Sequence, residues 1–407
     1  MTDPARPDAS EFHRAPDAPE ISIVIPTLNE ENSLGLCLEA ARRAIDQLGR
    51  PAEIIVVDGE STDRTREIAR EHGARILIEP RRGYGRALMT GFENARGRLL
   101  FMADADYTYD FEEIVPIYKI LLDNEADLVM GTRIKGRIEP GANPPLNRYL
   151  GTPLLSFLVR HFFRIPISDC HCGIRGFTAE AYRQMNMQSW GMAFGPEMVI
   201  KAGLAGMKVM ETPVTLRKDL PGRVPHLRPW RDGWTNLKLI CSYAPNYTFR
   251  WPGLILIGLG LWSLLRLTFS PTSETALFGI AVGNHAAILS GFLLVLGVQL
   301  VLISQFLRYY IPLFRLEVIA KRHARELTAR ARQPEFFMIS GASVGLVGLL
   351  LIGATFYRWV KLGLVNPEAI PVFTFGGVFL VTGAGLIFHS LLMGSIIDDY
   401  KYRGYLS

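Results

Sequence analysis

Two acidic residues separated by one small residue close a short apolar run, and their types and spacing suit metal binding. The run begins at Leu99 and ends in Asp104 and Asp106, with Ala105 between them. A short apolar run followed by polar residues predicts a buried strand. Two carboxylates just beyond a strand can share Mg²⁺ or Mn²⁺ and present it to a diphosphate, where the cation neutralises a departing phosphate. An isolated pair of this kind is more often a solvated turn, so its surroundings decide the interpretation.

Strands and helices alternate upstream of this pair. Strands are predicted at 21–26, 53–57 and 74–78, and each is followed by polar residues and then a helix. This alternation predicts an α/β domain with a mostly parallel sheet. Such sheets bind ligands at the carboxyl ends of their strands, and Glu30 and Asp58 fall there together with the acidic pair.

The polar residues at these strand ends suit a nucleotide. Asp58 can accept hydrogen bonds from the imide edge of a base or from ribose hydroxyls. The loop 81–86, which includes Arg82, offers cations and two glycines that let a backbone approach a ligand, although an ordinary turn before a helix fits as well. It lacks the third glycine of a dinucleotide fingerprint, and no Gly-x-x-x-x-Gly-Lys-Ser/Thr loop is present.

Three segments at the predicted strand ends form an ordered set. They are Ile-Val-Ile-Pro-Thr-Leu-Asn-Glu (23–30), Ile-Val-Val-Asp-Gly-Glu-Ser-Thr-Asp (55–63) and Ala-Asp-Ala-Asp (103–106). Together they resemble glycosyltransferase family 2, whose catalytic domain has the GT-A fold. The segments 130–133, 169–177 and 194–197 resemble one branch, the polyprenol-phosphate hexose synthases of the dolichol-phosphate mannose or glucose type. The resemblance implies an NDP-hexose donor, Mg²⁺ or Mn²⁺ at the Asp-x-Asp pair, and a polyprenyl phosphate acceptor.

The resemblance also implies residue roles. It implies that the nucleoside contacts Pro26, Glu30 and Asp58, and that the metal, diphosphate and sugar contact Asp104, Ala105 and Asp106. It places Arg133, helped by Arg148, at the acceptor phosphate, and Asp169, Arg175 and Glu197 around the sugar. The chain has Leu28 and Gly59 where the family often has Tyr and a second Asp, and Thr108 where mannose synthases commonly carry Gln.

Structural roles are open for several of these residues. Arg133 can instead pair with a surface acid, and Asp169 can form a structural salt bridge with Arg175. The segment Cys170–His171–Cys172 suggests zinc, but strand alternation would point His171 away from the two thiols, and no second ligand pair follows.

A basic segment separates the predicted catalytic domain from apolar sequence. A last strand is predicted at 207–217, followed by a stretch rich in Pro, Gly and basic residues. Arg217 and Arg223 can meet the lipid phosphate or the donor diphosphate, and attraction to anionic lipid headgroups explains them equally well. The stretch 230–250 interleaves aromatic and polar residues, which predicts a helix in the membrane interface.

Four apolar spans follow, at 252–269, 282–306, 336–357 and 370–393, each long enough or nearly so to cross a bilayer. Basic residues concentrate between the second and third spans, so the positive-inside rule places that loop, the catalytic domain and both termini in the cytoplasm. We therefore expect an integral protein of the inner or plasma membrane. The expected domains are a disordered tail (1–19), a GT-A catalytic domain (20–229), an interfacial helix region (230–250) and an all-α membrane domain of four transmembrane helices (251–407).

Composition agrees with this organisation. Hydrophobic residues make up 49% of the 407 residues, the net charge is a modest +5, and the four cysteines are too scattered for a disulfide framework. Because the cations lie beside apolar spans, we predict a membrane partner and no nucleic acid.

The predicted reaction is inverting transfer of a hexose, from UDP-glucose or GDP-mannose, to polyprenyl phosphate. A processive polysaccharide synthase is one alternative, because Gln305 to Tyr309 approaches its Gln-x-x-Arg-Trp motif. Transfer to another lipid and an inactive nucleotide-binding scaffold are the others. The sugar, the base and a homo-oligomeric state stay open.

Overall fold

A computed structural model describes residues 19–123, 126–220, 229–269, 276–277, 280–281, 284–328, 333–361 and 369–405. The chain forms two compact units, Met1–Ile240 and Cys241–Ser407. Each unit is described by itself.

The first unit is built on a seven-stranded sheet with the order β3-β2-β1-β4-β6-β5-β7. Only β6 runs antiparallel to its neighbours, β4 and β5, so the sheet is mostly parallel as predicted. The strands are β1 (Ile21–Thr27), β2 (Ala52–Asp58), β3 (Arg75–Ile78), β4 (Leu99–Met102), β5 (Leu128–Ile138), β6 (Arg175–Thr178) and β7 (Val209–Leu216).

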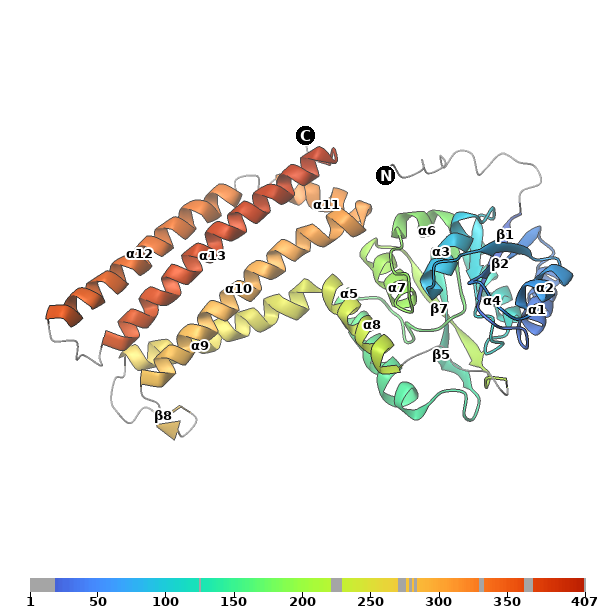
Figure 1. Ribbon diagram of the computed structural model, residues 1–407, viewed down its shortest axis with the longest axis horizontal. Helices are drawn as coiled ribbons and strands as arrows, with labels where there is room; N and C mark the ends of the chain where they lie inside the picture. Colours follow the sequence, from blue (N-terminus) through green and yellow to red (C-terminus); the bar gives the residue numbers. More distant parts are fainter. Residues whose placement is uncertain are drawn as a thin grey trace. The chain divides into compact units, whose positions relative to one another are not determined.

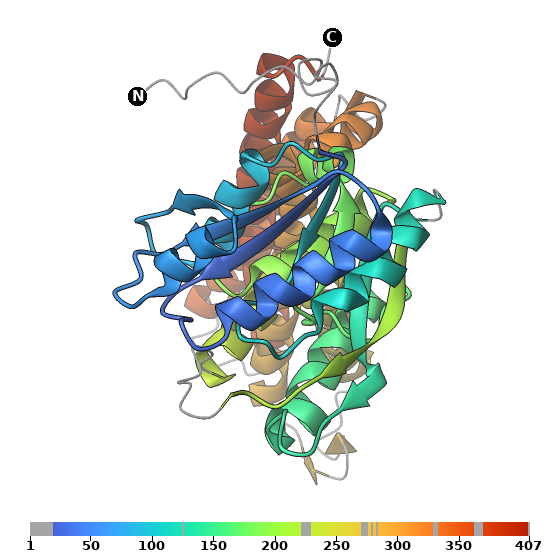
Figure 2. The same cartoon turned by 90° about the vertical axis from the view of Figure 1, so that its right-hand side faces the viewer.

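Helices cover both faces of this sheet (Figures 1 and 2). Alternate residues of β1 point to opposite faces: Ile23 joins the core beneath α1, whereas Val24 lies against Gly91 of α3. A Cβ at Gly91 would lie 2.2 Å from Val24 Cγ1, so a larger residue would push α3 off the sheet. The helical elements are α1 (Leu34–Leu48), α2 (Thr65–Glu71), α3 (Tyr84–Glu93), η2 (Phe111–Glu113), α4 (Ile114–Leu122), η3 (Asn147–Gly151), α5 (Thr152–Phe163), α6 (Ala179–Met185), α7 (Phe194–Leu204) and α8 (Pro229–Tyr243).

Local signals set several helix ends. Gly49 ends α1 with φ 60°, a left-handed conformation that glycine adopts without strain. Asp63 accepts a hydrogen bond from the N–H of Thr65, the first residue of α2, and so satisfies one backbone donor at that helix end. Thr178 caps α6 by accepting from the Ala181 N–H.

The second unit is helical. Among the described residues, four helices are long and apolar enough to cross a membrane, at Asn246–Arg266, Ala286–Arg315, Gln333–Lys361 and Val372–Tyr402. This agrees with the four predicted spans. Its elements are η4 (Asn246–Arg250), α9 (Trp251–Phe269), β8 (Ala276–Leu277), β9 (Ile280–Ala281), α10 (Asn284–Arg315), α11 (Glu317–Thr328), α12 (Gln333–Lys361) and α13 (Ala369–Tyr402).

Glycines bring α12 and α13 together along their length (Figure 1). A Cβ at Gly348 would lie 2.5 Å from the Leu380 backbone nitrogen, and one at Gly383 would lie 2.5 Å from the Gly341 carbonyl oxygen. Small residues allow this approach where the surrounding lipid offers no hydrophobic driving force between helices. The glycines of these two helices therefore allow their close packing at these positions.

Candidate active site

The predicted nucleotide-side residues lie at one edge of the sheet, because each follows a parallel strand. Glu30 comes after β1, Asp58 ends β2, and the acidic pair follows β4. Asp58 is fully buried, and its Oδ2 accepts from the Ser61 N–H at 3.0 Å. Its Oδ1 has no hydrogen-bond partner among the described residues, which leaves an acceptor for a ligand donor. Pro26, within β1, is half-buried beside it in the register of Val57.

Asp104 is held by Tyr84, a residue at the start of α3. The Tyr84 hydroxyl donates to Asp104 Oδ1 at 2.7 Å. Burial, and then the charge of Asp104, raise the pKa of Tyr84 well above its ordinary value, so the phenol stays protonated and remains a donor. On the other side, a Cβ at Gly173 would lie 2.1 Å from Asp104 Oδ2. Only glycine at position 173 leaves room for this carboxylate.

Asp106 is fixed within its own turn. Its Oδ1 accepts from the Thr108 N–H at 3.0 Å and from the Thr108 hydroxyl at 2.6 Å. Thr108 thus orients the second acid of the pair. The backbone of Tyr107 is left-handed, with φ 61°. Arg217, just beyond β7, lies 4.9 Å from the Tyr107 ring and pairs with Asp110.

Arg133, on β5, forms a two-pronged ion pair with Asp169. The guanidinium donates through Nε at 2.6 Å and through Nη2 at 2.8 Å. Asp169 is fully buried, and the Arg133 side chain is 13% exposed. Burial would raise the pKa of Asp169, but the charge of Arg133, its hydrogen bonds to the carboxylate and the nearby His171 together outweigh burial and hold that pKa below its ordinary value. The partner of Arg133 is therefore a buried acid and not a surface one.

Arg175, the first residue of β6, organises the preceding loop. Its guanidinium donates to the carbonyls of Cys172 at 2.9 Å, Cys170 at 2.8 Å and Gly195 at 2.6 Å. These bonds tie the loop to the start of α7. The alternative of a structural Asp169–Arg175 salt bridge is wrong, since Asp169 pairs with Arg133.

The strand alternation expected across Cys170–Cys172 is also wrong. β6 begins only at Arg175, so these residues lie in a loop. His171 Nδ1 lies 3.1 Å from Cys170 Sγ, on the same side as that thiol. No group of three His, Cys, Asp or Glu side chains suited to a metal occurs within the described ranges.

Glu197, on α7, lies in a buried ion pair. Its Oε1 is 2.8 Å from Lys201 Nζ, and both side chains are almost fully buried. Its Oε2 accepts from the backbone N–H groups of Ser189 at 2.7 Å and Gln188 at 3.2 Å. Glu197 thereby fixes the segment that precedes α7, and Gly195 and Pro196 of the same motif line the cavity described next.

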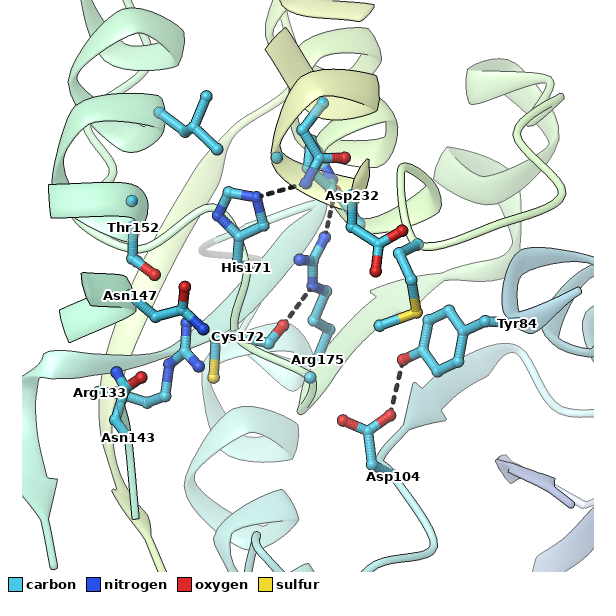
Figure 3. Close-up of a pocket in the computed structure, with 18 of the residues that line it drawn as sticks. Tyr84, Asp104, Arg133, Asn143, Asn147, Thr152, His171, Cys172, Arg175 and Asp232 are labelled. Carbon is cyan, nitrogen blue, oxygen red and sulfur yellow. Dashed lines mark hydrogen bonds between the residues drawn. The ribbon is translucent and has the colours of Figure 1, made fainter. Parts of the chain in front are cut away.

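One cavity of about 160 Å³ brings together three of the predicted residues, Asp104, Arg133 and Arg175 (Figure 3). Acidic and basic groups therefore share one small space. The other lining residues are Tyr84, Met102, Asn143, Asn147, Gly151, Thr152, Leu155, His171, Cys172, Gly173, Met192, Gly195, Pro196, Asp232, Gly233 and Asn236.

Among the predicted basic residues, Arg82 and Arg148 do not line this cavity. Arg82 is exposed in the loop before α3. Arg148 is exposed on η3, with its guanidinium carbon 5.4 Å from the Tyr149 ring, next to the cavity residue Asn147. Arg223 lies outside the described residues, as do His226 and Arg228. The two glycines of the loop 81–86 are approached by protein: Cβ atoms at Gly83 and Gly85 would lie 2.3 and 2.1 Å from backbone oxygens of residues 190 and 189.

Sequence reasoning missed the contributions of Tyr84, Asp232 and Asn236. The tyrosine was visible only as part of a glycine loop, and its contact with Asp104 spans 20 positions. Asp232 and Asn236 lie on α8, which the aromatic residues of that stretch identified only as a membrane-surface helix.

Comparisons with known proteins identify the family of the chain. The sequence model described as Glycosyl transferase family 2 matches residues 22–185. The low-salt glycan biosynthesis hexosyltransferase Agl6 of Haloferax volcanii is 34% identical over 406 residues, covering 95% of this chain and 94% of that protein. A dolichyl-phosphate hexose transferase of the same organism is 30% identical over 199 residues, covering 49% of this chain and 83% of that protein. A crystal structure of glucosyl-3-phosphoglycerate synthase from Mycobacterium tuberculosis aligns with a TM-score of 0.45 at 19% identity, covering 60% of this chain and 86% of that one.

The chain belongs to glycosyltransferase family 2. It is a glycosyltransferase with a GT-A domain followed by a helical region that holds four candidate membrane helices. The family and the fold class expected from the sequence are thereby confirmed.

Proposed function

We propose that the protein transfers a hexose from a nucleoside diphosphate sugar, UDP-glucose or GDP-mannose, to a polyprenyl phosphate, with inversion at the anomeric carbon. The observation that carries this proposal is the cavity that places Asp104 and Arg133 on shared walls at the carboxyl edge of the sheet. The name of the dolichyl-phosphate hexose transferase relative supports the acceptor class.

The acidic pair suits a divalent cation. Asp104 and Asp106 offer two carboxylates, and the part of the chain that the structure describes adds no third ligand group. Mg²⁺ is commonly held by one or two carboxylates, with substrate phosphates and water completing its shell. When bound, the cation would neutralise the charge that develops on the departing nucleoside diphosphate.

The remaining residues bind and align the substrates. Asp58 would accept hydrogen bonds from the nucleoside through its unpartnered Oδ1, beside Pro26 and Glu30. Arg133 would bind the acceptor phosphate, helped by Arg148, and its pairing with Asp169 keeps the guanidinium in one orientation. The acceptor phosphate is already anionic at pH 7, so alignment and charge stabilisation suffice without a strong general base. Attack opposite the leaving group would invert the anomeric centre.

The membrane topology is part of the same proposal. The basic segment that contains α11 carries Lys321, Arg322 and Arg325, which suits the cytoplasmic face of a membrane. The catalytic domain, proposed as 20–229, and both termini would then be cytoplasmic, with 230–250 at the interface and 251–407 in the membrane. Arg308, which belongs to the motif that suggested a processive synthase, lies in α10 and pairs with Glu326 of α11.

The test is a transfer assay on purified membranes that contain the protein. Polyprenyl phosphate and Mn²⁺ are supplied with radiolabelled UDP-glucose or GDP-mannose, and the organic-extractable, acid-labile product is counted. We expect the wild type to form this product and Asp106→Ala to reduce it at least 100-fold, because one of two carboxylates for the cation is lost. Asp46→Ala, an exposed change on α1, is the matched control and should retain full activity.

An insoluble polymer in place of the lipid product would refute the proposed acceptor in favour of a polysaccharide synthase. Nucleotide binding with no transfer of any kind would refute the proposed activity itself.

A further inference from the structure

Asn236 lines the cavity, and the oxygen of its side-chain amide is buried without a hydrogen-bond partner among the described residues. Asn236 is 5% exposed and lines the cavity together with Asp232 of the same helix. Its Oδ1 has no hydrogen-bond partner anywhere in the described part of the chain. A buried acceptor that loses water without gaining a partner costs about 1–3 kcal/mol. A ligand donor in the cavity would remove that cost.

The other end of the amide is held firmly. Asn236 Nδ2 lies 3.0 Å from His171 Nε2 (Figure 3). The imidazole is anchored in turn, because its Nδ1 lies 3.1 Å from Cys170 Sγ and its backbone N–H donates to Asp169 Oδ1. Asn236 is therefore linked, through His171 and Asp169, to the arginine proposed to bind the acceptor phosphate.

His171 is neutral at pH 7, so its Nε2 can accept a hydrogen bond from the amide nitrogen of Asn236, which can only donate. Burial lowers the pKa of His171 to about 4, with the nearby charges of Arg133 and Arg175 acting in the same direction against Asp169. The neutral ring has one acceptor nitrogen, and in the observed amide orientation Nε2 accepts from Asn236 Nδ2. Oδ1 then remains for the cavity.

The chemistry of the partner follows from this arrangement. A sugar hydroxyl can donate to Oδ1, and it could also accept from the amide if the amide were rotated. An ionised phosphate oxygen has no proton to donate and would be repelled by Oδ1. A hydroxyl is thus the group that fits in either orientation.

We infer that Asn236 is a specificity-determining residue that accepts a hydrogen bond from one hydroxyl of the hexose carried by the donor, and that His171 positions it. This inference rests on the proposed function, since it assigns the hydroxyl to the sugar of a nucleotide donor. Under this inference, a residue of α8 distinguishes one hexose from another by binding one of the sugar's hydroxyl groups. Sites built to bond a hydroxyl discriminate strongly against analogues that lack it.

The test measures donor binding without an acceptor. Calorimetry on the full-length protein in detergent with Mn²⁺ gives the affinities for UDP-glucose and UDP, and for GDP-mannose and GDP. The ratio of the affinity for a nucleotide sugar to the affinity for its nucleoside diphosphate gives the contribution of the sugar to binding. The affinity for the nucleotide sugar that binds more tightly is then compared with the affinities for its monodeoxy analogues. In the wild type, we expect one deoxy analogue to bind about tenfold more weakly than the parent sugar, as the loss of one buried hydrogen bond predicts.

In Asn236→Ala, we expect the parent sugar to lose this tenfold contribution and the same deoxy analogue to bind as well as the parent. Affinity for the nucleoside diphosphate should not change. Asn236→Asp keeps an acceptor at the same place and should retain the discrimination. Thr235→Ala, an exposed change at the preceding position of α8, is the matched control and should behave as the wild type.

Three results would overturn the inference. They are an equal loss of affinity for sugar donor and nucleoside diphosphate, unchanged discrimination in Asn236→Ala, or no sugar contribution in the wild type. Because no acceptor is present, the discrimination can be observed even if the transfer assay fails to yield a polyprenyl product, so the two proposals fail separately.

Discussion

Removing the Asp169 carboxylate should strongly destabilise the first unit, because it leaves the Arg133 charge inside the protein without its partner. Asp169 is fully buried and the Arg133 side chain is 13% exposed. Breaking a buried ion pair from one side typically costs about 3–5 kcal/mol. The residual exposure of Arg133 lets water reach part of the guanidinium, so we expect Asp169→Ala to cost about 3 kcal/mol, the lower end of that range.

A second substitution distinguishes the free-energy cost of losing the ion pair from the cost of leaving the Arg133 charge buried without a partner. Asp169→Ala combined with Arg133→Met removes both charges and should be more stable than Asp169→Ala alone, since well-packed apolar replacements of a buried pair are often close to neutral. Stability is measured from urea unfolding of the detergent-solubilised protein, followed by tryptophan fluorescence. A cost below about 0.5 kcal/mol for Asp169→Ala, or additive losses in the double variant, would refute this reasoning.

The same pair predicts a pH dependence. The pKa of Asp169 is lower in the folded protein than its ordinary value of about 3.9. Its stabilising contribution is therefore complete at neutral pH and is lost as the pH falls from about 4 through the folded pKa. The difference in unfolding free energy between wild type and Asp169→Ala should shrink in that window. An equal difference at pH 7 and pH 3 would contradict the assignment.

Two further predictions follow from geometry and charge. Gly173→Ala would place a Cβ 2.1 Å from Asp104 Oδ2, so the rate of Mn²⁺-dependent transfer should fall at least tenfold. Gly191→Ala is the control, because a Cβ there meets open space, and it should leave the rate unchanged. Equal rates for the two variants would argue against a fixed position of Asp104. A cysteine introduced at the exposed Lys321 should react with a membrane-impermeant maleimide only after cells are lysed, and labelling in intact cells would invert the proposed topology.

The sheet edge could be predicted from the sequence because its information is local. A strand that ends in Asp58, or in Asp104 and Asp106, places those side chains at the ligand edge whatever the rest of the chain does. The loop from Cys170 to Cys172 was misinterpreted for the opposite reason. Its conformation depends on the Arg175 guanidinium binding two carbonyls within the loop and a third on Gly195, a tertiary arrangement that no periodicity encodes.

The positions of the α8 residues that line the cavity could be predicted from the sequence only in part. Successive helical residues turn by about 100°, so Trp230 and Trp234 share one side of α8, and Asp232 and Asn236 share a side about 200° away. The structure agrees: the two tryptophans are 80% and 60% exposed, whereas the two polar residues line the cavity. Aromatic side chains of this kind favour a membrane interface. The exposed tryptophans and the buried Asn236 therefore lie on different sides of α8, a division that the helical spacing of these residues in the sequence already contains.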